Sequence, residues 1–131
     1  MEIALRDSQL NPEDVSYISA HGTGTRVNDR LETIAVKKAL GTAAYGTPMS
    51  PIKPMLGHTM GAASAIEAAA CALAVSDGCV PATMNFEERD PECDLDVVPN
   101  SSREMTVDVA MNNAYAFGGN NASVILRKFE G

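Results

Sequence analysis

Two histidines stand in short glycine-containing segments, each after a run of residues typical of a β-strand. His21 opens HGTGT after residues 15–20, and His58 lies in LGHTMG after residues 48–52. Glycine lets a backbone come close to a ligand, and α/β folds place their sites where strands end. Two imidazoles that converge there would donate N–H groups to a carbonyl oxygen on which negative charge develops. The plainer alternative for His21 is a polar loop residue that hydrogen-bonds to backbone.

A lysine and a glutamate form a second candidate pair. Glu67 lies in the otherwise apolar run AASAIEAAACALAV, where a carboxylate without a partner would be costly to bury. Lys53, which precedes the segment of His58, is its natural partner. Two interpretations stay open: a purely structural ion pair, or a pair that fixes the charge and orientation of the histidines.

Hydroxyl and aromatic side chains accompany the histidines. Thr23 and Thr25 place two hydroxyls on the segment that carries His21. Phe117, in AFGGNN, is either an aromatic residue of a turn or a gate. Gly118 and the glycine after it would allow such a turn to move.

The composition limits the partners and the location. The chain has 131 residues, 45% of them hydrophobic, which suffices for one domain or part of a larger one. Its net charge of −7 argues against a nucleic-acid backbone or an anionic membrane as the main partner. Residues 1–12 lack a signal-peptide pattern, and the longest apolar stretch, 62–75, is short for a membrane span. We therefore expect a soluble protein in a reducing, cytoplasmic setting.

The cysteines predict neither a disulfide nor a metal site. An odd number without paired spacing is not a disulfide framework, and two distant histidines do not complete a zinc site. None of the cysteines lies at a strand-to-helix turn beside a loop histidine, where a nucleophilic thiol would be activated. The three are Cys71, Cys79 and Cys93.

Strand-like and helix-like segments alternate, which predicts an α/β fold. Three helices are expected: one that ends at Gln9, one from a cap at Asn28 or Asp29 to Gly41, and one from Gly61 to Asp77. The expected strands are 15–20, 48–52, 107–113 and 122–127. The last two strands have hairpin-like sequence, and residues 53–61 and 81–100 are expected to be connections. The helix from Gly61 is apolar enough to be buried on most faces. We expect the sheet to be shared with chain outside this sequence.

Five segments, in order and with matching spacing, resemble the C-terminal part of a type II β-ketoacyl-acyl-carrier-protein synthase of the thiolase-like superfamily. They are AHGTGT, NDRLET, IKPMLGHTMGAASAIEAA, VPATMNFEERDPECDLDVVPN and AFGGNNAS. The resemblance covers nearly the whole chain and makes residues 1–131 the C-terminal portion of one synthase domain. It implies part of a layered αβαβα fold, whose sheet an N-terminal portion or a partner chain completes.

The resemblance implies a reaction in fatty-acid or polyketide synthesis. A cysteine holds an acyl chain as a thioester, malonyl carrier is decarboxylated, and the resulting enolate attacks that thioester. Positions that match catalytic residues of the family are His21, His58, Lys53 and Glu67. Positions that match its substrate-binding residues are Thr23 and Thr25, for the phosphopantetheine arm, and the gating Phe117 with Gly118.

The resemblance also implies partners. The nucleophilic cysteine of the family lies in an N-terminal motif absent here, so a cysteine-bearing portion or subunit is expected. An acyl carrier protein, a dimeric or higher assembly, and no cofactor or metal held by this chain are expected too. Rival interpretations are a non-catalytic stabilising or regulatory subunit, an inactive remnant, and decarboxylation without condensation. Both histidines and the lysine are present, which argues against a chain-length factor.

Five positions depart from the common pattern of the family. Ala116 is the departure with the clearest consequence, because alanine resists positive φ and predicts a less mobile Phe117. The departures are Arg26 for proline, Pro54 for serine, Ser64 for glycine, and Tyr115 and Ala116 for Phe-Gly.

Overall fold

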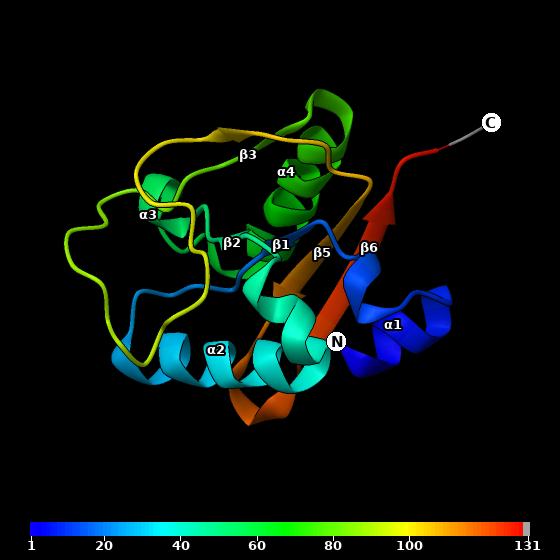
Figure 1. Ribbon diagram of the computed structural model, residues 1–131. Helices are drawn as coiled ribbons and strands as arrows, with labels where there is room; N and C mark the ends of the chain where they lie inside the picture. Colours follow the sequence, from blue (N-terminus) through cyan, green and yellow to red (C-terminus); the bar gives the residue numbers. More distant parts are fainter. Residues whose placement is uncertain (130–131) are drawn as a thin grey trace.

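Helices and strands alternate in the computed structural model of Figure 1, which describes residues 1–129. The α/β prediction is therefore confirmed. The helices are α1 (Glu2–Ser8), α2 (Arg26–Leu40), α3 (Lys53–Leu56) and α4 (Ala63–Asp77). The strands are β1 (Tyr17–Ser19), β2 (Met49–Ser50), β3 (Cys79–Val80), β4 (Arg103–Glu104), β5 (Val109–Ala114) and β6 (Ala122–Arg127).

The main sheet has four strands in the order β2-β1-β5-β6. β1 is parallel to both of its neighbours, so the carboxyl ends of β1, β2 and β5 lie at one edge. β5 and β6 form the expected hairpin, antiparallel from Val109 opposite Arg127 to Ala114 opposite Ala122. β3 and β4 form a separate antiparallel ribbon that the sequence did not predict, because two residues per strand are too few to show a period.

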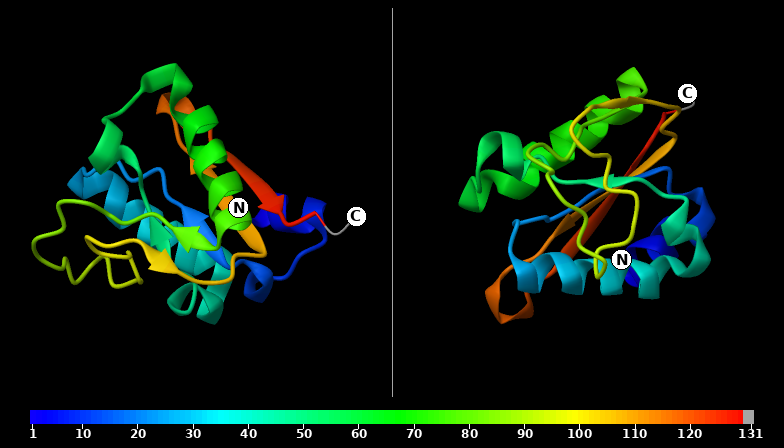
Figure 2. Two further views of the ribbon diagram at one scale, coloured as in Figure 1. Left: turned by 90° about the horizontal axis from the view of Figure 1, so that it is seen from above. Right: turned by 60° about the vertical axis from the view of Figure 1, so that its left-hand side comes forward.

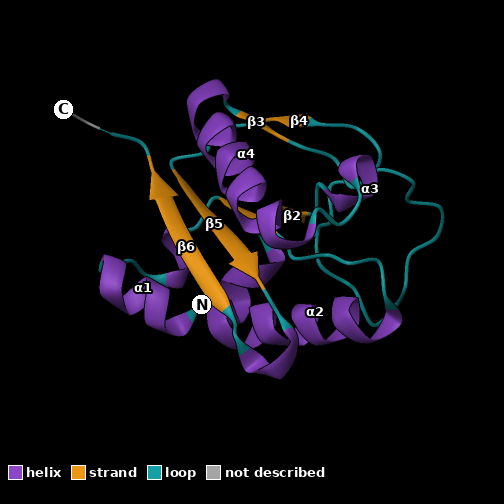
Figure 3. Cartoon of the chain, turned by 180° about the vertical axis from the view of Figure 1, so that it is seen from behind, coloured by secondary structure: helices purple, strands orange, loops and turns teal. Residues whose placement is uncertain are grey.

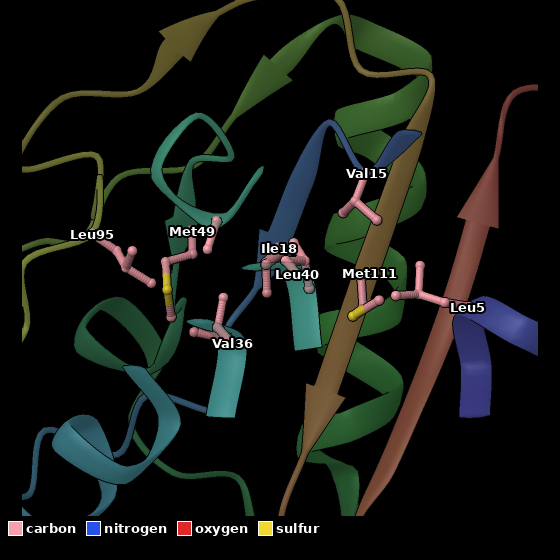
Figure 4. Packing of buried hydrophobic residues seen from close by; sticks show 10 residues of the cluster. Leu5, Val15, Ile18, Val36, Leu40, Met49, Leu95 and Met111 are labelled. Atoms are coloured by element: carbon pink, nitrogen blue, oxygen red, sulfur yellow. The ribbon is translucent and has the colours of Figure 1, made fainter. Parts of the chain in front are cut away.

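Helices cover both faces of the sheet (Figures 2 and 3). Neighbouring residues of a strand point to opposite faces, and this divides the core into two clusters. Ile18 and Met111 pack with residues of α1 and α2, whereas Tyr17 and Ala110 pack with α4. Figure 4 shows the first cluster, whose labelled members are Leu5, Val15, Ile18, Val36, Leu40, Met49, Leu95 and Met111.

The N-terminus of α2 differs from the sequence prediction. Its cap is Thr25, whose side-chain oxygen accepts a hydrogen bond from the backbone N–H of Asn28 at 3.4 Å. Asn28 and Asp29 are already helical, so the predicted cap at either of them is wrong. Thr25 has the extended backbone and the hydroxyl that a cap requires. α2 therefore begins directly after the segment of His21.

The connection predicted over residues 53–61 contains regular structure. Lys53 opens the single-turn helix α3, and a short 3-10 turn spans Met60–Ala62 before α4 begins. The pattern was too short to reveal either of them, because one turn of helix has no repeat. The predicted end of α4 is confirmed, since Gly78 caps it at φ 65°.

Only one face of α4 is buried in the described chain. Its buried residues are Ala63, Glu67, Cys71 and Ala74, so the expected burial on most faces is not found within residues 1–129. Ile66 and Leu73 on the outer face are 37% and 61% exposed. By length and composition Met60–Asp77 would suffice to cross a membrane, but its inner face packs on β5 and β6 as a core helix does.

Candidate active site

The predicted site residues converge at one edge of the sheet. His21 follows β1, Lys53 opens the helix that follows β2, and Phe117 follows β5. These three strands are parallel, so their carboxyl ends deliver all three residues to the same place. Glu67 reaches this edge from α4.

The segment of His21 is held by a residue that the sequence analysis did not select. The carboxylate of Glu32, on α2 and 2% exposed, accepts the backbone N–H groups of His21 at 2.8 Å and Gly22 at 2.9 Å. Burial raises the pKa of Glu32, while these two hydrogen bonds oppose the rise. NDRLET contributed to the family resemblance and to a predicted helix, but a sequence pattern does not show which backbone groups a carboxylate will contact.

Gly22 is the position where only glycine fits. Its φ is 43°, and a Cβ added there would lie 2.3 Å from Cβ of Pro51. The backbone therefore passes close to the segment between β2 and α3, whereas the sequence analysis expected the glycines to allow a close approach to a ligand. This close approach keeps His21 and Lys53 together.

Lys53 joins the elements of the site. Its Nζ donates to the carbonyl oxygen of His21 and to Oε1 of Glu67, and it lies 3.4 Å from Nδ1 of the His21 imidazole. The lysine and glutamate side chains are 6% and 2% exposed. The ion pair predicted from the sequence is therefore present, and it also contacts His21. The sequence analysis left two interpretations open, a structural ion pair and a pair that orients the histidines. The contacts of Lys53 with both Glu67 and His21 agree with either one.

Each imidazole has its Nδ1 engaged. An ammonium group can only donate, so Nδ1 of His21 is the acceptor towards Lys53. Nδ1 of His58 accepts the backbone N–H of Met60 at 3.1 Å. A neutral imidazole whose Nδ1 accepts carries its proton on Nε2. Both histidines are thus set as Nε2–H donors, with ring centroids 5.8 Å apart in an edge arrangement.

His21 is neutral near pH 7. Burial lowers its pKa most, the charges of Lys53 and His58 act in the same direction, and together they bring the pKa to about 4. The imidazole can therefore donate a hydrogen bond without bringing a positive charge into the site. His58 lies on the exposed segment after α3.

The predicted substrate-binding residues lie on the segment of His21 and on the turn after β5. The hydroxyls of Thr23 and Thr25 are 2.9 Å apart. Phe117 is fully exposed, and Gly118 after it has φ 79°. Ala116 has φ −135°, an ordinary extended backbone, so the turn does not require glycine at that position in this conformation.

Tyr115 is a second residue that the sequence analysis did not place in the site. Its ring centroid lies 5.4 Å from that of His21, with a 55° tilt between the planes. Its hydroxyl is buried and has no hydrogen-bond partner within residues 1–129. Burial raises the pKa of this phenol, and the charge of Glu32 raises it further.

No metal cluster and no disulfide occur in the part of the chain that the structure describes. Cys71 is buried in α4, where desolvation raises its pKa to about 11. Burial also raises the pKa of the Cys93 thiol. A raised pKa leaves little reactive thiolate, so neither thiol is activated as a nucleophile.

The comparisons with known proteins decide the family. The sequence model described as "Beta-ketoacyl synthase, C-terminal domain" matches residues 1–87. The chain belongs to this family. It is 50% identical over 127 residues to the 3-oxoacyl-[acyl-carrier-protein] synthase 2 of Synechocystis, covering 97% of this chain and 30% of that protein.

Solved ketosynthase structures share the fold. A structure described as the ishigamide ketosynthase/chain length factor is 46% identical with a TM-score of 0.93, over 97% of this chain and 31% of that one. A type II polyketide synthase acyl-carrier protein in complex with its ketosynthase bound to the hexaketide is 38% identical with a TM-score of 0.95, over 98% and 32%. The thiolase-like fold is therefore confirmed. The chain spans about a third of the length of these ketosynthases.

Proposed function

We propose that this chain is the histidine-bearing portion of a condensing enzyme that forms β-ketoacyl thioesters in fatty-acid or polyketide synthesis. The observation that carries the proposal is the pair of imidazoles, His21 and His58, each with its Nδ1 engaged and its Nε2–H left as a donor. The centroids of the two rings are 5.8 Å apart, so the two N–H groups can donate to the same oxygen atom.

The histidines would act on the malonyl thioester. Loss of CO2 leaves an electron pair that moves onto the thioester oxygen as an enolate, and the two N–H groups stabilise that charge. The enolate carbon then attacks the acyl thioester held on a cysteine. A new carbon–carbon bond forms, the carbon–sulfur bond breaks, and the thiolate leaves. Lys53 and Glu67 hold His21 in place and keep its Nε2 protonated rather than touching the substrate.

The reaction needs partners that supply the acyl thioester and the malonyl group. We propose a cysteine-bearing ketosynthase portion, in the same polypeptide or a second one, and an acyl carrier protein. Thr23 and Thr25 would contact the phosphopantetheine arm of the carrier, and Phe117 would close over the acyl chain. The solved carrier–ketosynthase complex supports a carrier as partner. A dimeric or higher assembly and a cytoplasmic location complete the proposal.

A non-catalytic stabilising or regulatory role is the second candidate. Its support is that burial raises the pKa of the Cys71 and Cys93 thiols, so neither is activated as a nucleophile. Such a subunit would leave condensation to another chain, and the histidines of this one would then be dispensable.

One experiment separates the two roles. The assembled synthase, meaning this chain together with its cysteine-bearing portion, is identified by native mass spectrometry with peptide identification of every species. Condensation is then measured with acyl and malonyl carrier, for the original protein and for His58→Ala. We expect acyl loading on the cysteine in both and β-ketoacyl product only in the first. Unchanged condensation in His58→Ala would favour the non-catalytic role, and product analysis with malonyl carrier alone would reveal decarboxylation without condensation.

A further inference from the structure

Within residues 1–129, three side chains lie beside the His21 imidazole, and two of them have a role in the proposed reaction. Lys53 lies at Nδ1, and His58 is the second N–H donor. The third is the ring of Tyr115, which follows β5. A centroid separation of 5.4 Å with tilted planes lies in the range where aromatic rings attract one another.

We propose that Tyr115 is a positioning residue for His21: its ring packs against the imidazole and holds it in the orientation that directs Nε2–H into the site. This inference rests on the proposed function. It differs from the roles given to Lys53 and Glu32. Lys53 holds the imidazole at the single atom Nδ1, and Glu32 holds the backbone of His21. The ring of Tyr115 packs beside the imidazole and restrains it over a wider surface.

The hydroxyl of Tyr115 is not the group that does this. It is buried without a partner among residues 1–129, and an unpaired buried hydroxyl is unfavourable. A phenylalanine at this position would keep the ring contact and remove the unpaired group. The ring, rather than the phenol oxygen, is therefore the part that His21 requires.

Loss of the ring would also admit water. Tyr115 lines a cavity of about 670 Å³ between α1, α2 and the start of β6. Truncation to alanine would extend that cavity towards the imidazole. The titratable groups around His21 would stay in place: Lys53 from α3, His58 after it, Glu32 from α2, and Glu67 from α4 through Lys53. A change in the His21 environment would then reflect hydration and loss of restraint.

The test compares Tyr115→Ala and Tyr115→Phe in the assembled synthase, with Tyr45→Ala as a control at an exposed tyrosine whose ring faces Lys37. For Tyr115→Ala we expect kcat for malonyl-carrier decarboxylation to fall about 10- to 100-fold, as for other small misplacements of catalytic groups, with KM unchanged. We expect Tyr115→Phe to restore the original rate. Tyr45→Ala should behave like the original protein.

A second readout needs no activity. The pKa of His21, about 4 in the original protein, is followed by NMR of histidine-labelled protein, and it should rise towards 6.5 in Tyr115→Ala and stay low in Tyr115→Phe. If Tyr115→Ala does not fold, Tyr115→Leu keeps the apolar volume and should still lower kcat. A folded variant without the ring that keeps both kcat and the His21 pKa overturns the inference. If the original protein neither decarboxylates nor condenses, the proposed function fails instead, and the NMR result still decides the role of Tyr115.

Discussion

At the scale of single residues, the site depends on the carboxylates of Glu32 and Glu67 and the ammonium group of Lys53. These groups act on His21 rather than on the substrate. Lys53 contacts the carbonyl oxygen of His21, its Nδ1 and the carboxylate of Glu67. The sequence predicted the Lys53–Glu67 pair because a buried charge needs a partner. It did not predict Glu32, since an acid on an amphipathic helix is normally taken for a solvent-facing residue.

Glu32→Gln should destabilise the protein. A glutamine offers one acceptor oxygen where two backbone N–H groups, of His21 and Gly22, now find two. One buried donor would lose its partner, so we expect the free energy of unfolding to fall by about 1–3 kcal/mol. Urea unfolding of the assembled synthase measures this, with the exposed Glu88→Gln as the matched control. Equal stability of the two variants would contradict the role given to Glu32.

His21 should make stability depend on pH in one window. Its pKa is about 4 in the folded protein against 6.5 for a free histidine. Between these values the unfolded chain binds a proton that the folded chain does not, so the free energy of unfolding falls as pH drops from about 6.5 to about 4. Above that window His21 contributes no pH dependence. In His21→Gln the unfolding free energy should fall less across this window, and an unchanged pH profile would argue against the lowered pKa.

At the scale of elements, the strand ends bring distant residues together. β1, β2 and β5 run parallel, so His21, Lys53 and Phe117 meet although they are far apart in the sequence. The sequence predicted all three strands and the α4 terminus at Gly78, because β-branched runs and glycine caps are local signals. It misplaced the cap of α2 at Asn28 or Asp29, because only the backbone shows that Thr25 is the extended residue before the helix.

Thr25→Ala should loosen the start of α2. Thr25 caps this helix and also lies beside the hydroxyl of Thr23. Loss of the cap should lower the free energy of unfolding by about 1 kcal/mol. Thr25→Ser keeps a hydroxyl and should retain most of the stability. Chemical unfolding of both variants provides the comparison, and a Thr25→Ala variant as stable as Thr25→Ser would show that the cap is unimportant.

At the scale of the whole molecule, the described chain leaves much apolar surface uncovered. Ile66 and Leu73 on α4 and Val124 on β6 are all exposed, as are Val27 and Leu31 on α2. Exposed patches of this kind mark surfaces that other chain covers. The relatives are about three times as long as this chain, which agrees with the sequence-based expectation that the sheet and α4 are shared.

Residues 1–131 alone should therefore be poorly stable. We expect weak thermal cooperativity and strong binding of a hydrophobic dye, because α4 would present its outer face to water. Calorimetry and dye fluorescence of the isolated chain measure both, and the assembled synthase is the control. A sharp, cooperative melt of a lone monomer would contradict this expectation.

The most direct measurement is the rate of CO2 release from malonyl carrier by the assembled synthase, for the original protein, His21→Ala and His58→Ala. If the two Nε2–H groups stabilise one enolate oxygen, each substitution should lower kcat by about 100-fold or more. The double variant should lose little beyond either single change, since one donor alone cannot complete the site. Decarboxylation within twofold of the original rate in either single variant would contradict the account.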